Sequence, residues 1–173
     1  TNTLARTAVV ENVVGGSGAN IFVFEDGAEF AGTIDGGSGP STLDYSAWTT
    51  SVSVNLNAGT ATGTRGVNNI DTIIGGSGDD VLIGDFGENV ITGGAGADIL
   101  NGVAGTDTLI GGVGDDIHVV NPGTNFVSII EAEGGGTDAL DYTGYAGAIA
   151  VNLRAGTATG TSSAVNVEQV LGG

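Results

Sequence analysis

Apolar residues return every nine positions through the middle of the chain, and glycines separate them. From Gly66 to Val119, six nine-residue units follow one another without a gap, and each begins with glycine. Positions 7 to 9 are rich in Val, Ile, Leu and Thr, with a large residue in the middle. This pattern predicts a short strand with one inward side chain after a glycine turn. The inward residues at position 8 are Ile73, Leu82, Ile91, Leu100, Leu109 and His118.

Two units are expected to close one coil of 18 residues, with coils stacked at the ~4.8 Å spacing of paired strands. A longer repeat of 97 residues adds two arms, because Val52–Thr64 returns as Ile149–Thr161. Apolar and polar residues alternate at Val52–Asn57, which predicts half-buried strands in these arms. No segment has a 3.6-residue pattern, so we expect almost no helix.

We predict one continuous module over 1–173. Its parts are degenerate N-terminal units (1–32), an inserted arm (33–65), consensus units (66–119), a second arm (120–163) and the start of a further repeat (164–173). Because the last two glycines would open another unit and the chain contains no Met, we expect it to belong to a larger parent protein.

Composition and charge restrict the chemistry and the partners. The chain has 34 Gly and no Cys, and three Lys and Arg face 20 Asp and Glu, for a net charge of −17. The lack of Cys excludes disulfides, zinc–thiolate sites and thiol nucleophiles. The charge disfavours nucleic acid and anionic membrane surfaces, and no apolar stretch is long enough to span a membrane.

GGSGDDVLI at Gly75–Ile83 and GGAGADILN at Gly93–Asn101 resemble the GGxGxDxUx nonapeptide of the repeats-in-toxin (RTX) family. The resemblance implies a calcium-binding fold with several Ca²⁺ ions. We therefore predict an all-β, right-handed parallel β-roll (a β-solenoid) with strand-rich inserted arms.

The acids at position 6 give this resemblance a physical reason. Stacked carboxylates about 5 Å apart repel one another, and a divalent cation between them removes the repulsion. Ca²⁺ accepts six to eight oxygens in flexible geometry, whereas zinc and copper favour His or Cys. One face carries Asp80, Asp98 and Asp116, and the other carries Asp71, Asn89 and Asp107.

We expect sites between Asp80 and Asp98 and between Asp98 and Asp116, so Asp98 belongs to two sites. Sites on the face of Asn89 should be weaker or empty. The resemblance implies that the ligands are position-6 side chains and turn carbonyls. The candidate ligands are Asp71, Gly75, Ser77, Asp80, Gly84, Asn89, Gly93, Ala95, Asp98, Gly102, Ala104, Asp107, Gly111, Val113 and Asp116.

The resemblance also implies a role and a location. We expect a calcium-binding structural and folding module of a larger secreted bacterial protein, exported by type I secretion and folding on Ca²⁺ outside the cell. The alternative is an extracellular glycan- or surface-binding module, of an adhesin or epimerase-accessory type. Nothing in the sequence indicates an enzyme, because no catalytic motif accompanies His118.

Several side chains keep two interpretations. His118 is favoured as a core or cap residue over a ligand, and Trp48 and Tyr145 as packing residues over a sugar-stacking surface. The further acids of the consensus units are expected to be surface charges that point outward and not ligands; they are Asp79, Asp85, Glu88 and Asp115. Glu11 and Glu168, which precede glycine pairs, could each cap the roll or bind metal.

Overall fold

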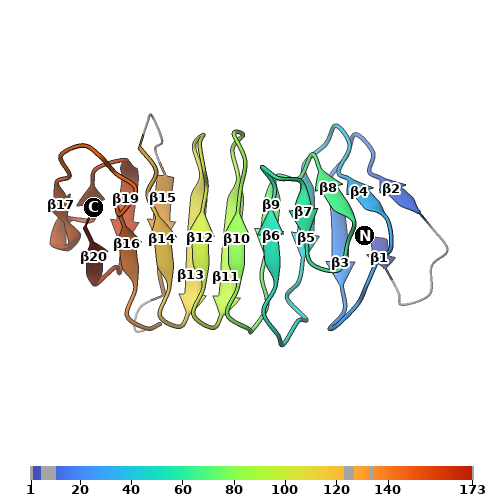
Figure 1. The fold of residues 1–173 in the computed structure, drawn as a ribbon, viewed down its shortest axis with the longest axis horizontal. Helices are drawn as coiled ribbons and strands as arrows, with labels where there is room; N and C mark the ends of the chain where they lie inside the picture. Colours follow the sequence, from blue (N-terminus) through green and yellow to red (C-terminus); the bar gives the residue numbers. More distant parts are fainter. Residues whose placement is uncertain (1, 5–10, 123–126, 133–134, 173) are drawn as a thin grey trace.

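The computed structural model describes residues 2–4, 11–122, 127–132 and 135–172, and these form an elongated stack of short strands. Strands follow one another along the long axis, from the blue N-terminal end to the red C-terminal end (Figure 1). The single helical element is the 3₁₀ turn η1 (Leu153–Ala155) among these described residues. The fold is therefore all-β and consistent with the predicted parallel β-roll.

Sheet one has eight strands, all paired in parallel. In order across the sheet they are β1 (Asn2–Leu4), β3 (Asn20–Phe24), β5 (Ser41–Asp44), β9 (Thr72–Ile74), β11 (Val90–Ala95), β13 (Thr108–Val113), β15 (Val127–Ile130) and β19 (Thr161–Val165).

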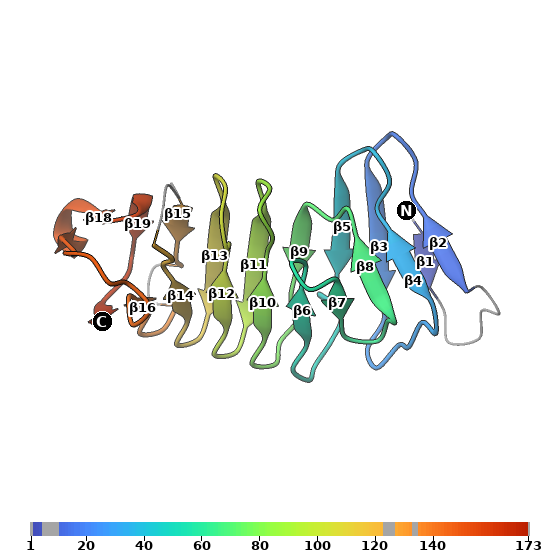
Figure 2. The same ribbon diagram turned by 45° about the horizontal axis from the view of Figure 1, so that its top comes forward.

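Sheet two has seven strands, parallel except for its last pair. In order they are β20 (Gln169–Leu171), β16 (Ala139–Asp141), β14 (Ile117–Val119), β12 (Ile99–Asn101), β10 (Val81–Ile83), β6 (Ser53–Asn55) and β7 (Thr60–Ala61). In Figures 1 and 2, β10 lies level with β11 and β12 level with β13, so each coil gives one strand to each sheet.

The consensus coils have the predicted length. Thr72 pairs with Val90 and Val90 with Thr108, so one coil advances 18 residues along sheet one. Val81 pairs with Ile99 in sheet two with the same spacing. The nine-residue period in the sequence therefore corresponds to half a coil.

The position-8 side chains form the core as two columns, one from each sheet. All of them are fully buried, His118 included. The column of sheet one contains Phe22, Leu43, Ile73, Ile91, Leu109 and Ile129. The column of sheet two contains Val54, Leu82, Leu100, His118 and Leu140. Burying each large apolar side chain contributes about 1.5–3 kcal/mol, which favours this register over a one-residue slip.

Two smaller sheets complete the structure. A three-stranded parallel sheet joins β2 (Asn12–Val14), β4 (Thr33–Asp35) and β8 (Gly66–Asn68) near the N-terminal end. An antiparallel pair joins β17 (Val151–Asn152) and β18 (Thr157–Ala158).

The predicted first arm is only partly separate from the stack. Strands β4 and β5, which fall within 33–65, pair in parallel with their neighbours. Strand β6 also pairs in parallel with β10 in sheet two. What departs from the parallel stack is β7, which folds back antiparallel on β6 after the turn at Asn57–Gly59. Strand β5 stays in the parallel stack because Gly36–Asp44 (GGSGPSTLD) has the glycine turn of a nine-residue unit before it, although the position-6 residue of this unit is Ser41 and not an acid.

Candidate functional site

A column of carboxylates runs along the edge of sheet two. Each acid of this column immediately precedes a strand of sheet two: Asp80 precedes β10, Asp98 precedes β12 and Asp116 precedes β14. The backbone N–H of Asp80 donates to Asp98 Oδ1, and the N–H of Asp98 donates to Asp116 Oδ1, both over 2.8 Å. Parallel pairing of the strands thus brings the position-6 acids of one face together, coil after coil.

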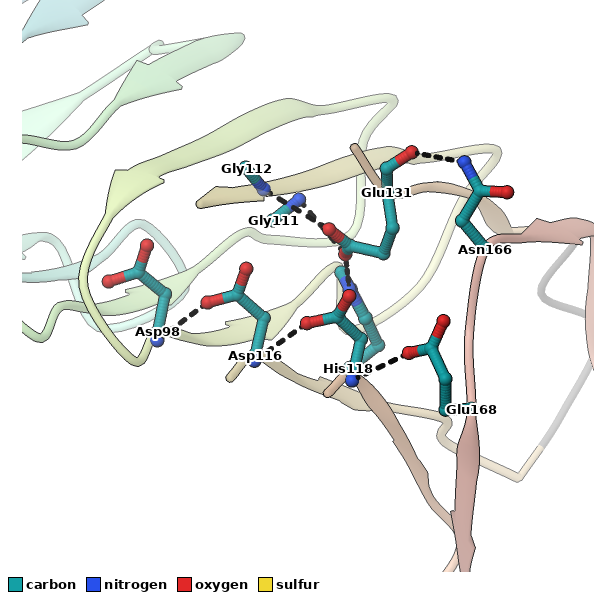
Figure 3. A network of polar contacts seen from close by, with 9 residues as sticks. Asp98, Gly111, Gly112, Asp116, His118, Glu131, Asn166 and Glu168 are labelled. Atoms are coloured by element: carbon teal, nitrogen blue, oxygen red, sulfur yellow. Dashed lines mark hydrogen bonds and ion pairs between the residues drawn. The ribbon is translucent and has the colours of Figure 1, made fainter. Parts of the chain in front are cut away.

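The same column continues beyond the consensus units. The N–H of Asp116 donates to Asp138 Oδ1, and the N–H of Asp138 donates to Glu168 Oε2, both over 2.9 Å. At the other end, Val52 N–H donates to Asp80 Oδ1 over 2.8 Å. Figure 3 shows Asp98, Asp116 and Glu168 along this line. Glu168, left open between a cap and a ligand, is therefore part of the column.

Asp138 was missed by the sequence analysis. Its local sequence Gly136-Thr137-Asp138 has the glycine–x–acid order of positions 4 to 6, which could have revealed it. The signal was hidden because this coil is longer: Ile117 pairs with Ala139, 22 residues on, instead of 18.

The opposite face is less regular. The N–H of Asn89 donates to Asp107 Oδ1 over 3.0 Å, as in the first column. The side-chain oxygen of Asn89, however, accepts from Asp85 N–H of its own turn over 2.8 Å. Asp71 is exposed and accepts from Ser41 N–H. Strand register thus aligns Asp71, Asn89 and Asp107. A backbone N–H of one coil donates to the position-6 side chain of the next only between Asn89 and Asp107 among these three residues.

Burial makes four of the position-6 carboxylates, those of Asp80, Asp98, Asp107 and Asp116, hard to ionise in the absence of a cation. Asp98 is 1% exposed, and burial raises its pKa to about 7, with repulsion from Asp116 and Asp80 adding to the effect. Burial likewise raises the pKa values of Asp107 and Asp116 to about 6. The pKa of Asp80 is also raised, mainly by burial. Each shift means that a buried negative charge lacks a compensating positive one.

Two of these carboxylates have a free oxygen. Asp98 Oδ2 and Asp116 Oδ2 are buried and have no hydrogen-bond partner among the described residues. Asp80 Oδ2, by contrast, accepts from Gly76 N–H over 2.8 Å. Buried polar atoms are nearly always satisfied, so orphaned anionic oxygens in a row fit a bound cation. Carboxylate oxygens with nearby carbonyls are a donor set that suits Ca²⁺.

The position-1 glycines stand directly in front of the carboxylates. A Cβ on Gly93 would overlap Asp98 Oδ2 and lie 2.7 Å from the carbonyl oxygen of Gly111. Gly75 is placed in the same way before Asp80 and the Gly93 carbonyl. Glycine is required here because the carboxylate of its own unit and the carbonyl of the next coil occupy the side-chain space. On the opposite face Gly84 and Gly102 stand before Asn89 and Asp107.

Among the position-3 residues, Ala95 and Val113 are the last residues of strands β11 and β13, and Ser77 and Ala104 lie in bends between the sheets. Their backbone N–H groups bond the previous coil, as Ala95 N–H does to Gly76 O over 3.0 Å and Ala104 N–H to Asp85 O over 3.2 Å. Ser77 N–H donates to Trp48 O, and the Val113 carbonyl accepts from Gly96 N–H. The assignment of their carbonyls as ligands stays a prediction.

Acids at position 5 bind turns instead of entering the column. Asp79 Oδ1 accepts from Ala97 N–H and Asp115 Oδ1 from Thr137 N–H, both over 2.8 Å. Both residues and Glu88 are exposed, and Asp85 is half-buried. These acids agree with the outward orientation expected of them.

Within each of the two arms the aromatic side chains pack against one another, whereas Phe86, in a turn of the consensus units, is 75% exposed. Tyr45 and Tyr142 are fully buried and donate through their hydroxyls to backbone carbonyls. Trp48 is 6% exposed and meets Tyr45 edge to face, with ring centroids 5.7 Å apart. Tyr145 makes the equivalent contact with Tyr142. The packing interpretation of Trp48 and Tyr145 therefore agrees with the structure.

His118 lies in the core between Leu100 and Leu140, and its Nε2 contacts Glu131 Oε1. None of the described residues forms a helix with the length and apolarity of a membrane crossing.

A comparison with curated proteins finds no match for the chain. A comparison with protein families matches the RTX calcium-binding nonapeptide repeat, in four copies, at residues 65–100 and 83–118. The matched region contains the acids of both columns from Asp71 to Asp116. Residues 65–118 of this chain therefore match the RTX calcium-binding nonapeptide repeat, a structural module whose repeats bind several calcium ions.

Proposed function

We propose that this chain is a folding and structural module of a larger secreted bacterial protein, and that calcium binding between its coils drives its folding outside the cell. The observation that carries the proposal is the buried column from Asp80 to Asp116, with two orphaned carboxylate oxygens. Such a column is unfavourable in a folded chain unless a cation is bound.

Within this proposal, each ion lies between two successive position-6 acids of one face. One ion is bound by side-chain oxygens of Asp80 and Asp98, and the next by those of Asp98 and Asp116. The glycine turns supply carbonyl oxygens, such as those of Gly93 and Gly111. Calcium supplies the positive charge that the column lacks. The residues of the chain supply the spacing, because strand pairing fixes the distance between rungs.

The proposal links calcium to export through concentration. A chain of net charge −17 repels itself, and each Ca²⁺ adds two positive charges. Because the sites exist only in the folded chain, the binding free energy contributes to folding. Extracellular calcium modules bind with Kd values of about 10⁻⁴–10⁻³ M, so the chain would remain unfolded in a calcium-poor cytosol and fold outside. RTX repeats occur in secreted bacterial proteins, which supports this location; the type I route is part of the proposal.

The glycan-binding alternative has less support. A sugar-stacking surface needs several exposed aromatic rings. Tyr45, Tyr142 and Trp48 are buried and Tyr145 is half-buried, so among the described aromatic residues Phe86 alone is exposed. Thr60, Thr62 and Thr64 alternate along the first arm, and the hydroxyl of Thr62 is already bonded to the backbone N–H and carbonyl of Ser53.

The test is a calcium titration followed by far-UV circular dichroism and by calorimetry on the same chain. The proposal expects a disordered spectrum in chelator, a strand spectrum in millimolar calcium, and several ions bound per chain. Magnesium at equal concentration is the control and should not replace calcium, since it requires a tighter octahedron and keeps its waters. A spectrum that is the same with calcium and with chelator would refute the proposal.

A further inference from the structure

Glu131 breaks the glycine rule of the column. Strand β15 pairs Ile130 with Ile110, so Glu131 occupies the place that Gly75, Gly93 and Gly111 hold in the preceding coils. In those coils the position-1 residue has no side chain, because the carboxylate of position 6 occupies the space. Here a third carboxylate enters the same space.

The carboxylate of Glu131 is held in a defined orientation. Its Oε1 accepts from Gly111 N–H and its Oε2 from Gly112 N–H, both over 3.1 Å. His118 Nε2 contacts Oε1 from within the core, and since a carboxylate only accepts, Nε2 carries the hydrogen. Figure 3 shows Glu131 pointing from above toward His118, beside the row of aspartates. Glu131 itself is only 3% exposed.

Three carboxylates converge at this point. Asp116, Glu131 and Asp138 each present an oxygen, and these oxygens all lie within 4.8 Å of one another. All three residues are buried. Two oxygens bound to one Ca²⁺ at 2.3–2.6 Å are at most about 5 Å apart, so the spacing fits a single ion.

A second observation points to a ligand at the same place. Asp116 Oδ2 is buried and without a hydrogen-bond partner among the described residues. It faces the Cα of Gly111, as do both oxygens of Glu131, since a Cβ built there would overlap all three. The orphaned oxygen is therefore aimed into the cluster. Burial raises the pKa of Asp116, and repulsion from Glu131 and Asp138 adds to the effect.

We propose that Asp116, Glu131 and Asp138 form an additional calcium site, with three carboxylate ligands, that binds Ca²⁺ more tightly than the glycine-turn sites between Asp80, Asp98 and Asp116. The inference rests on the proposed function, because it assumes that the columns bind calcium. Affinity for Ca²⁺ increases with the number of charged ligands. Each glycine-turn site supplies two carboxylates, whereas this site supplies three. His118 is a positioning residue that orients Glu131 from the core.

The chemistry favours calcium over other divalent cations. The ligand atoms are oxygens, and the imidazole nitrogen beside them, His118 Nε2, is engaged by Glu131. Zinc favours nitrogen and sulfur ligands. Magnesium keeps several waters, which a cluster of three buried carboxylates does not accommodate.

The experiment is isothermal titration of calcium into the chelator-treated chain, for the wild type and three variants. Glu131→Gln removes the charge and keeps the shape, and Glu131→Gly restores the residue of the other coils. Glu88→Gln is the matched control, because it removes an exposed charge that lies outside the column from Asp80 to Glu168; its charge acts on Asp107 of the opposite face. Circular dichroism in 10 mM calcium establishes that each variant folds.

The wild type should show one site at least about tenfold tighter than the rest. Glu131→Gln and Glu131→Gly should lose this site, and Glu88→Gln should keep it. If Glu131→Gln does not fold in calcium, Glu131→Gly decides. If the wild type folds and all its calcium sites are equally weak, the inference is wrong and the proposed function stands. The same conclusion follows if the Glu131 variants keep the tight site. A wild type that binds no calcium overturns both.

Discussion

Asp98→Asn is expected to change stability in opposite directions with and without calcium. Asp98 is shared by two proposed sites, accepts from Asp80 N–H, and has its second oxygen free. Its pKa is raised from 3.8 to about 7 by burial and by the neighbouring acids. Since each pKa unit corresponds to about 1.4 kcal/mol, ionising this group in the calcium-free fold costs on the order of 4 kcal/mol at neutral pH and above.

An amide at position 98 keeps an oxygen that can accept from Asp80 N–H and removes the cost of ionisation. In chelator at pH 8, the folded state should therefore become more stable, by up to a few kcal/mol. For a chain of this size, 1 kcal/mol corresponds to about 2–4 °C in Tm. In 10 mM calcium the variant should melt at a lower temperature than the wild type, because two sites lose a charged ligand and about a tenfold or more in affinity each.

Two measurements follow the effect: the folded fraction in chelator at pH 8 by circular dichroism, and Tm in 10 mM calcium by calorimetry, with Glu88→Gln as the control for loss of one exposed charge. The control should change either quantity little. If Asp98→Asn does not raise the folded fraction in chelator, or does not lower Tm in calcium, the reasoning from a buried, cation-dependent carboxylate is wrong.

Three further predictions follow from the same geometry. Gly93→Ala should destabilise the calcium-bound chain by about 1–3 kcal/mol and weaken calcium binding, since its Cβ would overlap Asp98 Oδ2, whereas Gly16→Ala, with open space around it, should melt like the wild type. Leu100→Ala should lower the free energy of unfolding in calcium by about 2–5 kcal/mol in denaturant titrations, because it opens a cavity in a fully buried column; a loss below 1 kcal/mol would argue against this core. In chelator, the folded fraction measured by circular dichroism should rise as pH falls from 8 to 5, because Asp98, Asp107 and Asp116 have raised pKa values and the folded chain binds more protons than the unfolded one in this range. In calcium the trend should reverse, since protons compete with the ion, and parallel pH profiles in the two conditions would contradict the assignment.

The regular part of the fold could be predicted from the sequence because a single unit repeats in it. Inward residues such as Leu82 and Leu100 recur at the same place in each unit, and strand pairing leaves one register that buries them all. The same register places Asp80, Asp98 and Asp116 in one column, so the candidate site follows from the repeat.

The irregular part could not be predicted in the same way, because coil length varies there. Thr108 pairs with Ser128 after 20 residues, and Ile117 pairs with Ala139 after 22, so Glu131 and Asp138 fall outside a strict nine-residue count. Val127–Glu131 (VSIIE) corresponds to Asp107–Gly111 (DTLIG), but its acid stands where the pattern requires glycine. The three-stranded sheet of β2, β4 and β8 could not be predicted from the repeat, because its strands pair across 21 residues (Asn12 with Thr33) and 33 residues (Thr33 with Gly66) instead of 18.

Anomalous X-ray diffraction from crystals of this chain grown in calcium tests the central claim most directly. The account predicts calcium peaks between Asp80 and Asp98 and between Asp98 and Asp116, within about 2.6 Å of their carboxylate oxygens. An ordered column of these aspartates with only water between the rungs would contradict it.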